Sequence, residues 1–345
     1  MTEKKNRKKN CEKSNKLNFK VNKLVSNLPQ VARNQDVDLI NAWGILVHDD
    51  IIWVADNGTG FITSYDFKGN KVFPNITVPP ATVVPPPIGT TGKPTGIIFN
   101  KSKGFVISNG TSSASSFLLI ATEDGTIAGY NPLVDPLNAI TVIDNSLFGA
   151  VYKGLALSEN LLYAADFFNN KIDVFNSDFV LIPPPINGLR FADLTPTYPI
   201  PSSFAPFNIV RLHEKIYVLY ARQNPPDNED DLPGKGFGFV NVFDLEGNFI
   251  KRLISGGKLN SPWGFAIGPK DFGKFSGKFL IGNFGDGRIN AYDHRGNFIG
   301  TLRNKRGRYI FIDGLWGLYS LNKKLFFASG PNFETNGLVG IIKKK

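Results

Sequence analysis

The sequence has one cysteine, one methionine and three histidines in 345 residues. Cys11 alone cannot form an internal disulfide bond or a cysteine-rich metal site, so packing must hold the fold together. No run of 18 or more apolar residues is present, and no apolar segment follows the N-terminal lysines, so we predict neither a membrane-spanning helix nor a secretory signal. We therefore expect a soluble protein that is intracellular rather than secreted.

The net charge of +10 comes from the two ends of the chain. Residues 1–23 carry nine Lys or Arg against two Glu, and residues 343–345 add three lysines. Residues 24–342 hold 27 basic and 27 acidic residues, so the body is neutral. We predict basic tails at residues 1–16 and 343–345, and we expect contact with nucleic acid or an acidic surface only through these tails.

A short motif that opens an apolar run occurs six times along the chain. The copies are "NAWGILV", "KPTGIIF", "VYKGLAL", "APFNIVRL", "SPWGFAI" and "GLWGLYS". Their anchoring residues, Gly44, Gly96, Gly154, Asn208, Gly264 and Gly317, are 52 to 58 residues apart. This spacing is typical of the blades of a β-propeller.

Each anchor is followed by a second apolar strand, a polar turn and a third strand, as in "FLIGNFGDGRINAYD". Turns such as "LEGN" and "HRGN" then lead into a fourth strand. The pattern predicts an all-β, six-bladed propeller of four-stranded antiparallel blades in a single domain over residues 17–342. The sixth copy ends after its third strand, so we predict that residues 17–26 supply its outer strand and close the ring.

The ordered motifs also resemble a protein family. "LINAWGI", "VADNGTG", "ATEDGTIAGYNP", "DNSLFGAVYKGLAL", "YAADFFNNKIDVF", "SPWGFAI", "GNFGDGRINAYD" and "IDGLWGL" are similar to those of an uncharacterised, mainly bacterial family of six-bladed propellers with NHL-like repeats. Many members carry PEP-type sorting signals, whereas this chain has lysine-rich ends. The resemblance implies the fold and no established activity. The Lys- and Asn-rich composition would suit an AT-rich genome such as that of a large virus, in which case packaging in the virion is an alternative location.

Alternation of strand direction places the start of each first strand and the end of each second strand on one face of the ring. We therefore predict a polar ligand site at this mouth of the central channel. Turn formation and packing between blades are the alternative roles for each single residue. The predicted ligand-binding residues are Asn41, Trp43, Asp56, Asn57, Glu123, Lys153, Asp166, Asn208, Trp263, Asn283, Asp286, Asp313 and Trp316.

Oxygen-bearing side chains at this mouth suggest a hard cation. Asp56, Asp166 and Asn283 occupy the same register, nine residues before an aromatic residue in their repeats. With Asn208 they form a candidate Ca²⁺ site, since calcium takes six to eight oxygen ligands. The three histidines fall in turns of the opposite face, which argues against a Ser/His/Asp triad or a histidine-bound zinc.

Two functions remain open. The favoured one is a non-catalytic binding or scaffold propeller that holds a small polar ligand or a protein at the mouth, because no nucleophile-and-base pair is legible. The alternative is a calcium-dependent hydrolase of lactonase or esterase type at the same place. The acidic insertion "RQNPPDNEDDLPGKGFG" should overhang this mouth, where it could supply Asp227, Glu229, Asp230 and Asp231 as a lid or as ligands.

Overall fold

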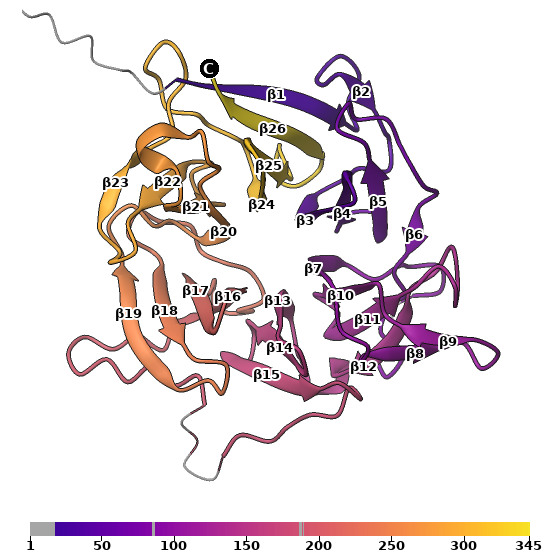
Figure 1. Ribbon diagram of the computed structural model, residues 1–345. Coiled ribbons are helices and arrows are strands. Elements are labelled where there is room, and N and C mark those ends of the chain that lie inside the picture. Colours follow the sequence, from indigo (N-terminus) through magenta and orange to yellow (C-terminus); the bar gives the residue numbers. More distant parts are fainter. Residues whose placement is uncertain (1–17, 85–86, 186–187, 189) are drawn as a thin grey trace, which may run out of the picture.

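The computed structural model describes residues 18–84, 87–185, 188 and 190–345. Six small antiparallel sheets stand in a ring, with the first strand of each sheet nearest the central axis (Figure 1). The predicted six-bladed propeller is confirmed. The predicted basic tail at residues 1–16 lies outside the described residues.

The strands follow the repeats in chain order. The first blade contains β3 (Ala42–His48), β4 (Ile51–Asp56), β5 (Phe61–Tyr65) and β6 (Ile76–Thr77). The second contains β7 (Pro94–Phe99), β10 (Leu118–Thr122), β11 (Thr126–Tyr130) and β12 (Ile140–Asp144), and the third β13 (Tyr152–Leu157), β14 (Leu161–Asp166) and β15 (Lys171–Asn176). The fourth contains β16 (Phe204–Leu212), β17 (Lys215–Arg222), β18 (Phe239–Phe243) and β19 (Phe249–Ser255).

The last two blades complete the ring. The fifth contains β20 (Pro262–Ile267), β21 (Phe279–Asn283), β22 (Ile289–Tyr292) and β23 (Phe298–Thr301). The sixth contains β24 (Leu315–Leu321), β25 (Lys324–Ser329) and β26 (Leu338–Lys344), followed outward by β1 (Phe19–Ser26) and the short parallel β2 (Asn34–Gln35). Two 3-10 turns (Ser146–Phe148 and Gly273–Phe275) and the hairpin β8 (Val106–Ser108) and β9 (Ser113–Ser115) lie between these strands.

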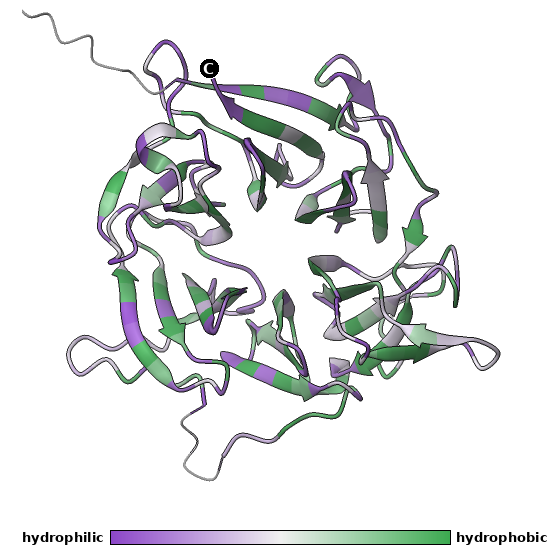
Figure 2. Cartoon of the chain, in the orientation of Figure 1, coloured by the Kyte–Doolittle hydropathy of each residue, from purple (hydrophilic) through white to green (hydrophobic). Residues whose placement is uncertain are grey.

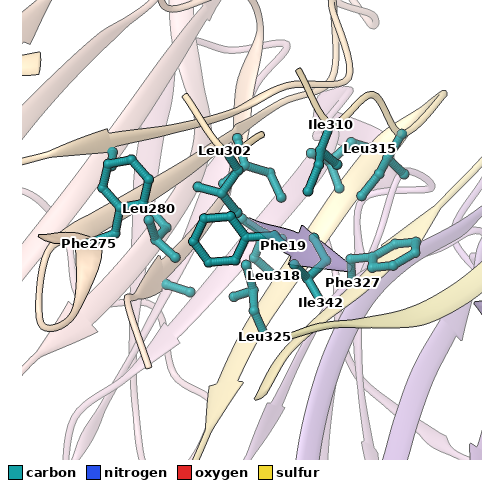
Figure 3. Packing of buried hydrophobic residues seen from close by; sticks show 14 of the residues in the cluster. Phe19, Phe275, Leu280, Leu302, Ile310, Leu315, Leu318, Leu325, Phe327 and Ile342 are labelled. Carbon is teal, nitrogen blue, oxygen red and sulfur yellow. The ribbon is translucent and has the colours of Figure 1, made fainter. Parts of the chain in front are cut away.

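The N-terminal strand closes the ring, as predicted. β1 pairs antiparallel with β26 from Phe19 opposite Lys344 to Ser26 opposite Leu338. Phe19 is 2% exposed and packs with Phe272 and Phe275 of the fifth blade and with Ile342 of the sixth (Figure 3). The two ends of the chain therefore bury apolar surface jointly and cover the open edge of the sixth blade.

Three details differ from the expectation. Lys343 and Lys344 belong to β26, because they pair with Lys20 and Phe19 of β1 rather than forming a tail. The third blade has three strands, and its fourth strand is reduced to a bridge between Phe175 and Leu181. Prolines at 183–185 follow directly and lack the N–H groups that would extend this pairing. The β8–β9 hairpin was not anticipated.

The repeated anchor glycine has a packing cause. A Cβ on Gly44 would lie 2.5 Å from the carbonyl oxygen of Thr95, and one on Gly317 would lie 2.5 Å from that of Trp43. The first strands of adjacent blades thus approach too closely around the channel for a side chain. In the fourth repeat Asn208 replaces the glycine and donates a hydrogen bond of 2.7 Å to the carbonyl oxygen of Trp263 in the next blade.

Apolar segments lie on strands of every blade, whereas polar and apolar residues alternate along outer strands such as β1 and β19 (Figure 2). This pattern fits strands that bury one face against a neighbouring blade and expose the other. No helix in the described part of the chain is long and apolar enough to cross a membrane.

Candidate functional site

One hydrogen bond recurs in all six blades and defines the mouth. The residue after each second strand donates its backbone N–H to the carbonyl oxygen of the residue that precedes the first strand of the same blade. The donor–acceptor distances are 2.8–3.0 Å for Asn57–Asn41, Glu123–Lys93, Phe167–Val151, Gln223–Ser203, Phe284–Ser261 and Gly330–Gly314. Starts of first strands and ends of second strands therefore do meet on one face.

The channel is closed just inside this face. The residues directly before the six anchors are at most 5% exposed, and they are Trp43, Thr95, Lys153, Phe207, Trp263 and Trp316. The Trp43 and Trp316 rings stack with centroids 3.6 Å apart, and Trp263 meets both of them edge-on at 6.1 and 5.9 Å. Phe284 also stacks on Trp316, with ring centroids 3.9 Å apart. These rings form an aromatic floor beneath the mouth.

Lys153 is the one cation among these six residues. Its side chain is 1% exposed, and its ammonium lies 5.0 Å from the centre of the Trp43 ring. Nζ donates to Glu123 and, at 3.2 Å, to Asp230 Oδ1. Burial opposes the charge, but the two carboxylates outweigh it and hold the pKa of Lys153 above its ordinary value. Lys153 is thus a fixed ammonium, unsuited to act as a nucleophilic amine at neutral pH.

A chain of side-chain hydrogen bonds continues from Glu123 across the mouth. Asn57 donates to Glu123 Oε2 at 2.8 Å, and Asn41 donates to Asn57 Oδ1 at 3.1 Å. Trp316 Nε1 donates to Asn41 Oδ1 at 3.2 Å. The two asparagines therefore link the aromatic floor to the carboxylate that holds Lys153.

The acidic insertion of the fourth blade reaches over this network, as predicted. It leaves β17 and returns as a short bridge between Gln223 and Asp231, which places Asp230 against Lys153 of the third blade. The Gln223 side chain donates to the carbonyl oxygens of Phe167 and Phe168, at 2.8 and 3.1 Å, and so fixes the base of the insertion. Burial raises the pKa of Asp231 to about 6.

A second acidic loop, between β25 and β26, was not recognised from the sequence. Asn332, Phe333 and Glu334 have φ values of 57°, 52° and 65°, a left-handed run that is strained for residues other than glycine. Such strain is often found at binding sites. Burial, reinforced by the charge of Glu123, raises the pKa of Glu334 to about 7.

Six buried polar atoms of residues on this face have no hydrogen-bond partner within the described residues. They are Trp43 Nε1, Asp231 Oδ2, Ser261 Oγ and Glu334 Oε1 and, at the ends of second strands, Asp56 Oδ1 and Asn283 Oδ1. Unpaired buried polar groups are rare, and each is expected to be satisfied by water or by a ligand. Donors and acceptors are both present, so the arrangement suits a ligand with polar groups of its own.

Several predicted site residues form hydrogen bonds close to the turns of their own blades. Asp56, Asp166 and Asn283 are each the last residue of a second strand and are fully buried. Asp56 accepts from Thr63 at 2.7 Å, Asp166 from Asn169 at 2.8 Å, and Asn283 donates to Asp286 Oδ1 at 3.0 Å. These contacts lie within their own blades, and none of them joins two of the three residues.

The remaining predicted residues are also engaged locally. The Asn208 amide nitrogen donates to the carbonyl oxygen of Trp263, and its Oδ1 accepts from the backbone N–H of Ile209. Asp313 accepts from the backbone N–H of Asn332 at 2.8 Å. Residues 18–84, 87–185, 188 and 190–345 contain no cluster of three or more His, Cys, Asp or Glu side chains that could hold a metal ion. Calcium binding by Asp56, Asp166, Asn208 and Asn283 stays a prediction.

The other end of the channel is open. A cavity of about 1200 Å³ runs from the ends of the first strands inward to Trp263 and Asn208. His48 and His213 line it, in agreement with their predicted place on the opposite face. The aromatic floor therefore separates this cavity, which polar and apolar residues line alike, from the acidic mouth.

Solved structures share the fold. A Bacteroides thetaiotaomicron protein of unknown function aligns over 89% of this chain and 70% of its own, with a TM-score of 0.55 and 12% identity. Streptogramin B lyase aligns over 95% and 98% (TM-score 0.53, 13% identity), and luciferin-regenerating enzyme over 89% and 92% (0.52, 10%). At these identities the likeness concerns the fold alone.

Sequence relatives are viral. The uncharacterized protein R648 of Acanthamoeba polyphaga mimivirus is 40% identical over 94% of this chain and 80% of its own length. The uncharacterized protein L690 of the same virus is 38% identical over 94% and 86%. No family model matches, so the resemblance to bacterial NHL-like propellers with PEP signals stays a prediction. The chain, a six-bladed β-propeller, belongs to the family of the mimivirus proteins R648 and L690.

Proposed function

We propose that the protein is a binding propeller whose acidic mouth takes a small organic cation. The observation that carries this proposal is the charge balance around Lys153. Four carboxylates, those of Glu123, Asp230, Asp231 and Glu334, act on one another through space, and a single ammonium opposes them. A second cation would relieve this imbalance.

Two of the unpartnered carboxylate oxygens support the same ligand class, whereas Trp43 Nε1, a donor, would need a water molecule. Asp231 Oδ2 and Glu334 Oε1 are buried acceptors without a hydrogen bond of good geometry, although Ser261 lies beside the first carboxyl and Asn41 beside the second. A protonated amine carries only donors. The aromatic floor adds favourable cation–π contacts, a role that Trp43 already plays toward the Lys153 ammonium at 5.0 Å. An aliphatic diamine fits these requirements, because it brings two positive charges and an apolar stem.

Binding requires the two acidic loops to move. Lys153 and the tryptophans are almost fully buried, whereas the Asp230 side chain is 77% exposed at the surface of the insertion. The ligand would therefore enter between the insertion and the loop of Glu334. No contact in the described structure favours a calcium-dependent hydrolase over binding.

The test is calorimetric titration of the full chain at pH 8 with 1,4-diaminobutane, 1,4-butanediol and succinate. We expect only the diamine to bind, and Glu334→Gln to weaken it about tenfold through loss of a charge-assisted hydrogen bond. Glu159→Gln, which changes a carboxylate at the opposite end of the channel, is the matched control. Binding of the diol or succinate in place of the diamine, or unchanged diamine affinity in Glu334→Gln, would contradict the proposal.

A further inference from the structure

The neutral body of the protein conceals a strongly basic region. Residues 251–308 hold twelve Lys or Arg and three Asp or Glu, a net charge of +9. The rest of residues 24–342 holds fifteen basic and twenty-four acidic residues. The basic residues belong to the outer strand of the fourth blade, the fifth blade and the loop that follows it.

Part of this region forms a recess at the outer side of the fifth blade. The cavity measures about 660 Å³ and is lined by three cations, Lys258, Lys274 and Arg303, and by the aromatic residues Phe275, Phe298 and Tyr309. No carboxylate lines it. Within the described residues, none of the three cations forms an ion pair with Asp or Glu. Clustered like charges repel one another, so an anion bound in the recess would reduce the repulsion between the three cations.

Each cation lies over one aromatic ring. Lys258 is 5.9 Å from the centre of Phe298, Lys274 is 5.2 Å from Phe275, and Arg303 is 3.8 Å from Tyr309. The Arg303 guanidinium also donates to the carbonyl oxygen of Gly307 at 2.7 Å. The charges are therefore held in place before any ligand arrives, which lowers the entropy lost on binding.

The basic N-terminal segment is tethered to the same recess. Asn18 lines the cavity, and Phe19 donates its backbone N–H to the carbonyl oxygen of Arg303 at 2.9 Å. In Figure 1, β1 begins beside the fifth blade, next to the C-terminus. Residues 1–17, which precede this point in the chain, carry seven Lys or Arg.

We propose that this recess binds single-stranded nucleic acid. Phosphates would contact Lys258, Lys274 and Arg303. A base would stack on Phe298, whose side chain is 44% exposed. Cations beside exposed aromatic rings, here Phe298 and Tyr309 at 44% and 43% exposure, are the recognition pattern of flexible single strands. A duplex keeps its bases stacked inside and could not use the rings of a recess. The expected contact thus extends from the tails, where the sequence placed it, onto the propeller itself.

The experiment is fluorescence anisotropy of the full chain with a labelled 12-nucleotide oligo(dT), repeated over a range of salt concentrations. The test variant is Lys258→Glu/Lys274→Glu/Arg303→Glu. The matched control is Lys68→Glu/Lys103→Glu/Lys215→Glu, which makes the same charge change at exposed lysines of three other blades. We expect the test variant to lose at least a hundredfold in affinity and about two units of the salt slope, and the control to lose far less.

Phe298→Ala separates stacking from charge. We expect about a tenfold loss of affinity with the salt slope unchanged. Equal loss in both triple variants, or full affinity in the test variant together with complete loss on removal of residues 1–16, would overturn the proposal. So would equal affinity for a 12-base-pair duplex, or retention by phosphatidylserine vesicles without oligonucleotide binding. Melting curves of each variant exclude unfolding as the cause.

Discussion

At the scale of single residues, the acidic mouth contains groups whose ionisation opposes folding. Glu334 has a folded-state pKa of about 7, raised from 4.5 because its carboxyl is buried beside Glu123. A raised pKa means that the folded state prefers the protonated acid. The associated stabilisation is complete below pH 4.5 and is lost as the pH rises to 7.

Glu334→Gln should therefore stabilise the protein at high pH. We expect the free energy of unfolding of the variant, relative to that of the native chain, to be about 1–2 kcal/mol higher at pH 8 than at pH 5, after allowance for partial solvent screening. Urea unfolding at the two pH values measures this difference. Glu159→Gln, at the opposite end of the channel, should show no such change. If the difference in free energy of unfolding between Glu334→Gln and the native chain were the same at pH 5 and pH 8, the assignment would be contradicted.

The same substitution is expected to weaken cation binding, so stability and function conflict at this residue. A cation at the mouth would favour the ionised forms of Glu334 and Asp231, which makes binding stronger as the pH rises from 6 to 8. Groups that destabilise the free protein and improve ligand binding are common at functional sites.

The predicted ligand-binding residues include both Asp56 and Asn57 in the first repeat, but only Asp166 and Asn283, without the residues that follow them, in the third and fifth. Side chains alternate along a strand, so the last residue of a second strand and the one after it face opposite ways. Asp56 and Asp166 cap turns, while Asn57 and Phe167 face the mouth. Register between repeats could have identified Phe167 and Phe284, because both follow the matched residues Asp166 and Asn283. Glu334 lies in a loop without a repeat equivalent and had no such signal.

At the scale of strands, closure by β1 is the element most open to test. Phe19 is 2% exposed between the fifth and sixth blades (Figure 3). Phe19→Ala should lower the free energy of unfolding by about 3–5 kcal/mol, the usual loss for a buried phenylalanine. Urea unfolding measures the loss, and Lys20→Ala on the exposed side of β1 should cost little. Equal stability of the two variants would mean that β1 does not hold the ring.

Closure by the N-terminal strand could be predicted because the chain has one extra strand at its start and lacks one strand at its end. An alternating strand precedes the first anchor, and the sixth repeat lacks its fourth strand. The missing fourth strand of the third blade was not predicted, because four strands were assumed in every repeat. The prolines at 183–185 carried that information, because proline cannot donate to a strand ladder.

At the scale of the whole molecule, the protein separates its charges. The mouth is acidic, while the outer side of the fifth blade is basic. Averaging over residues 24–342 gave zero and concealed both regions. Counting over a sliding window of residues, rather than over the whole body, would have shown the net charge of +9 in residues 251–308. The two proposed sites are thus distinct in place, in charge and in ligand.

Calcium content is the whole-molecule property that separates a binding propeller from the alternative hydrolase. Calcium needs six to eight oxygen ligands around one point. One oxygen of Asp56, one of Asp166 and the amide nitrogen of Asn283 bond to Thr63, Asn169 and Asp286 within separate blades, while Asp56 Oδ1 and Asn283 Oδ1 are buried without a partner in the described residues. We expect elemental analysis of the purified protein to find no stoichiometric calcium, and EDTA to leave the melting temperature unchanged.

The contrary result would be equally informative. A metal that binds the folded state but not the unfolded state, at a concentration a hundredfold above its Kd, would stabilise the fold by about 2.7 kcal/mol. EDTA would remove this stabilisation and lower the melting temperature clearly. One equivalent of calcium with such a drop would require Asp56 and Asp166 to leave their turns and face the channel. Asp56→Ala and Asp166→Ala would then abolish metal retention, whereas Glu159→Gln at the opposite end of the channel would not. Loss of stability without any bound metal in the two alanine variants would instead identify both carboxylates as turn caps.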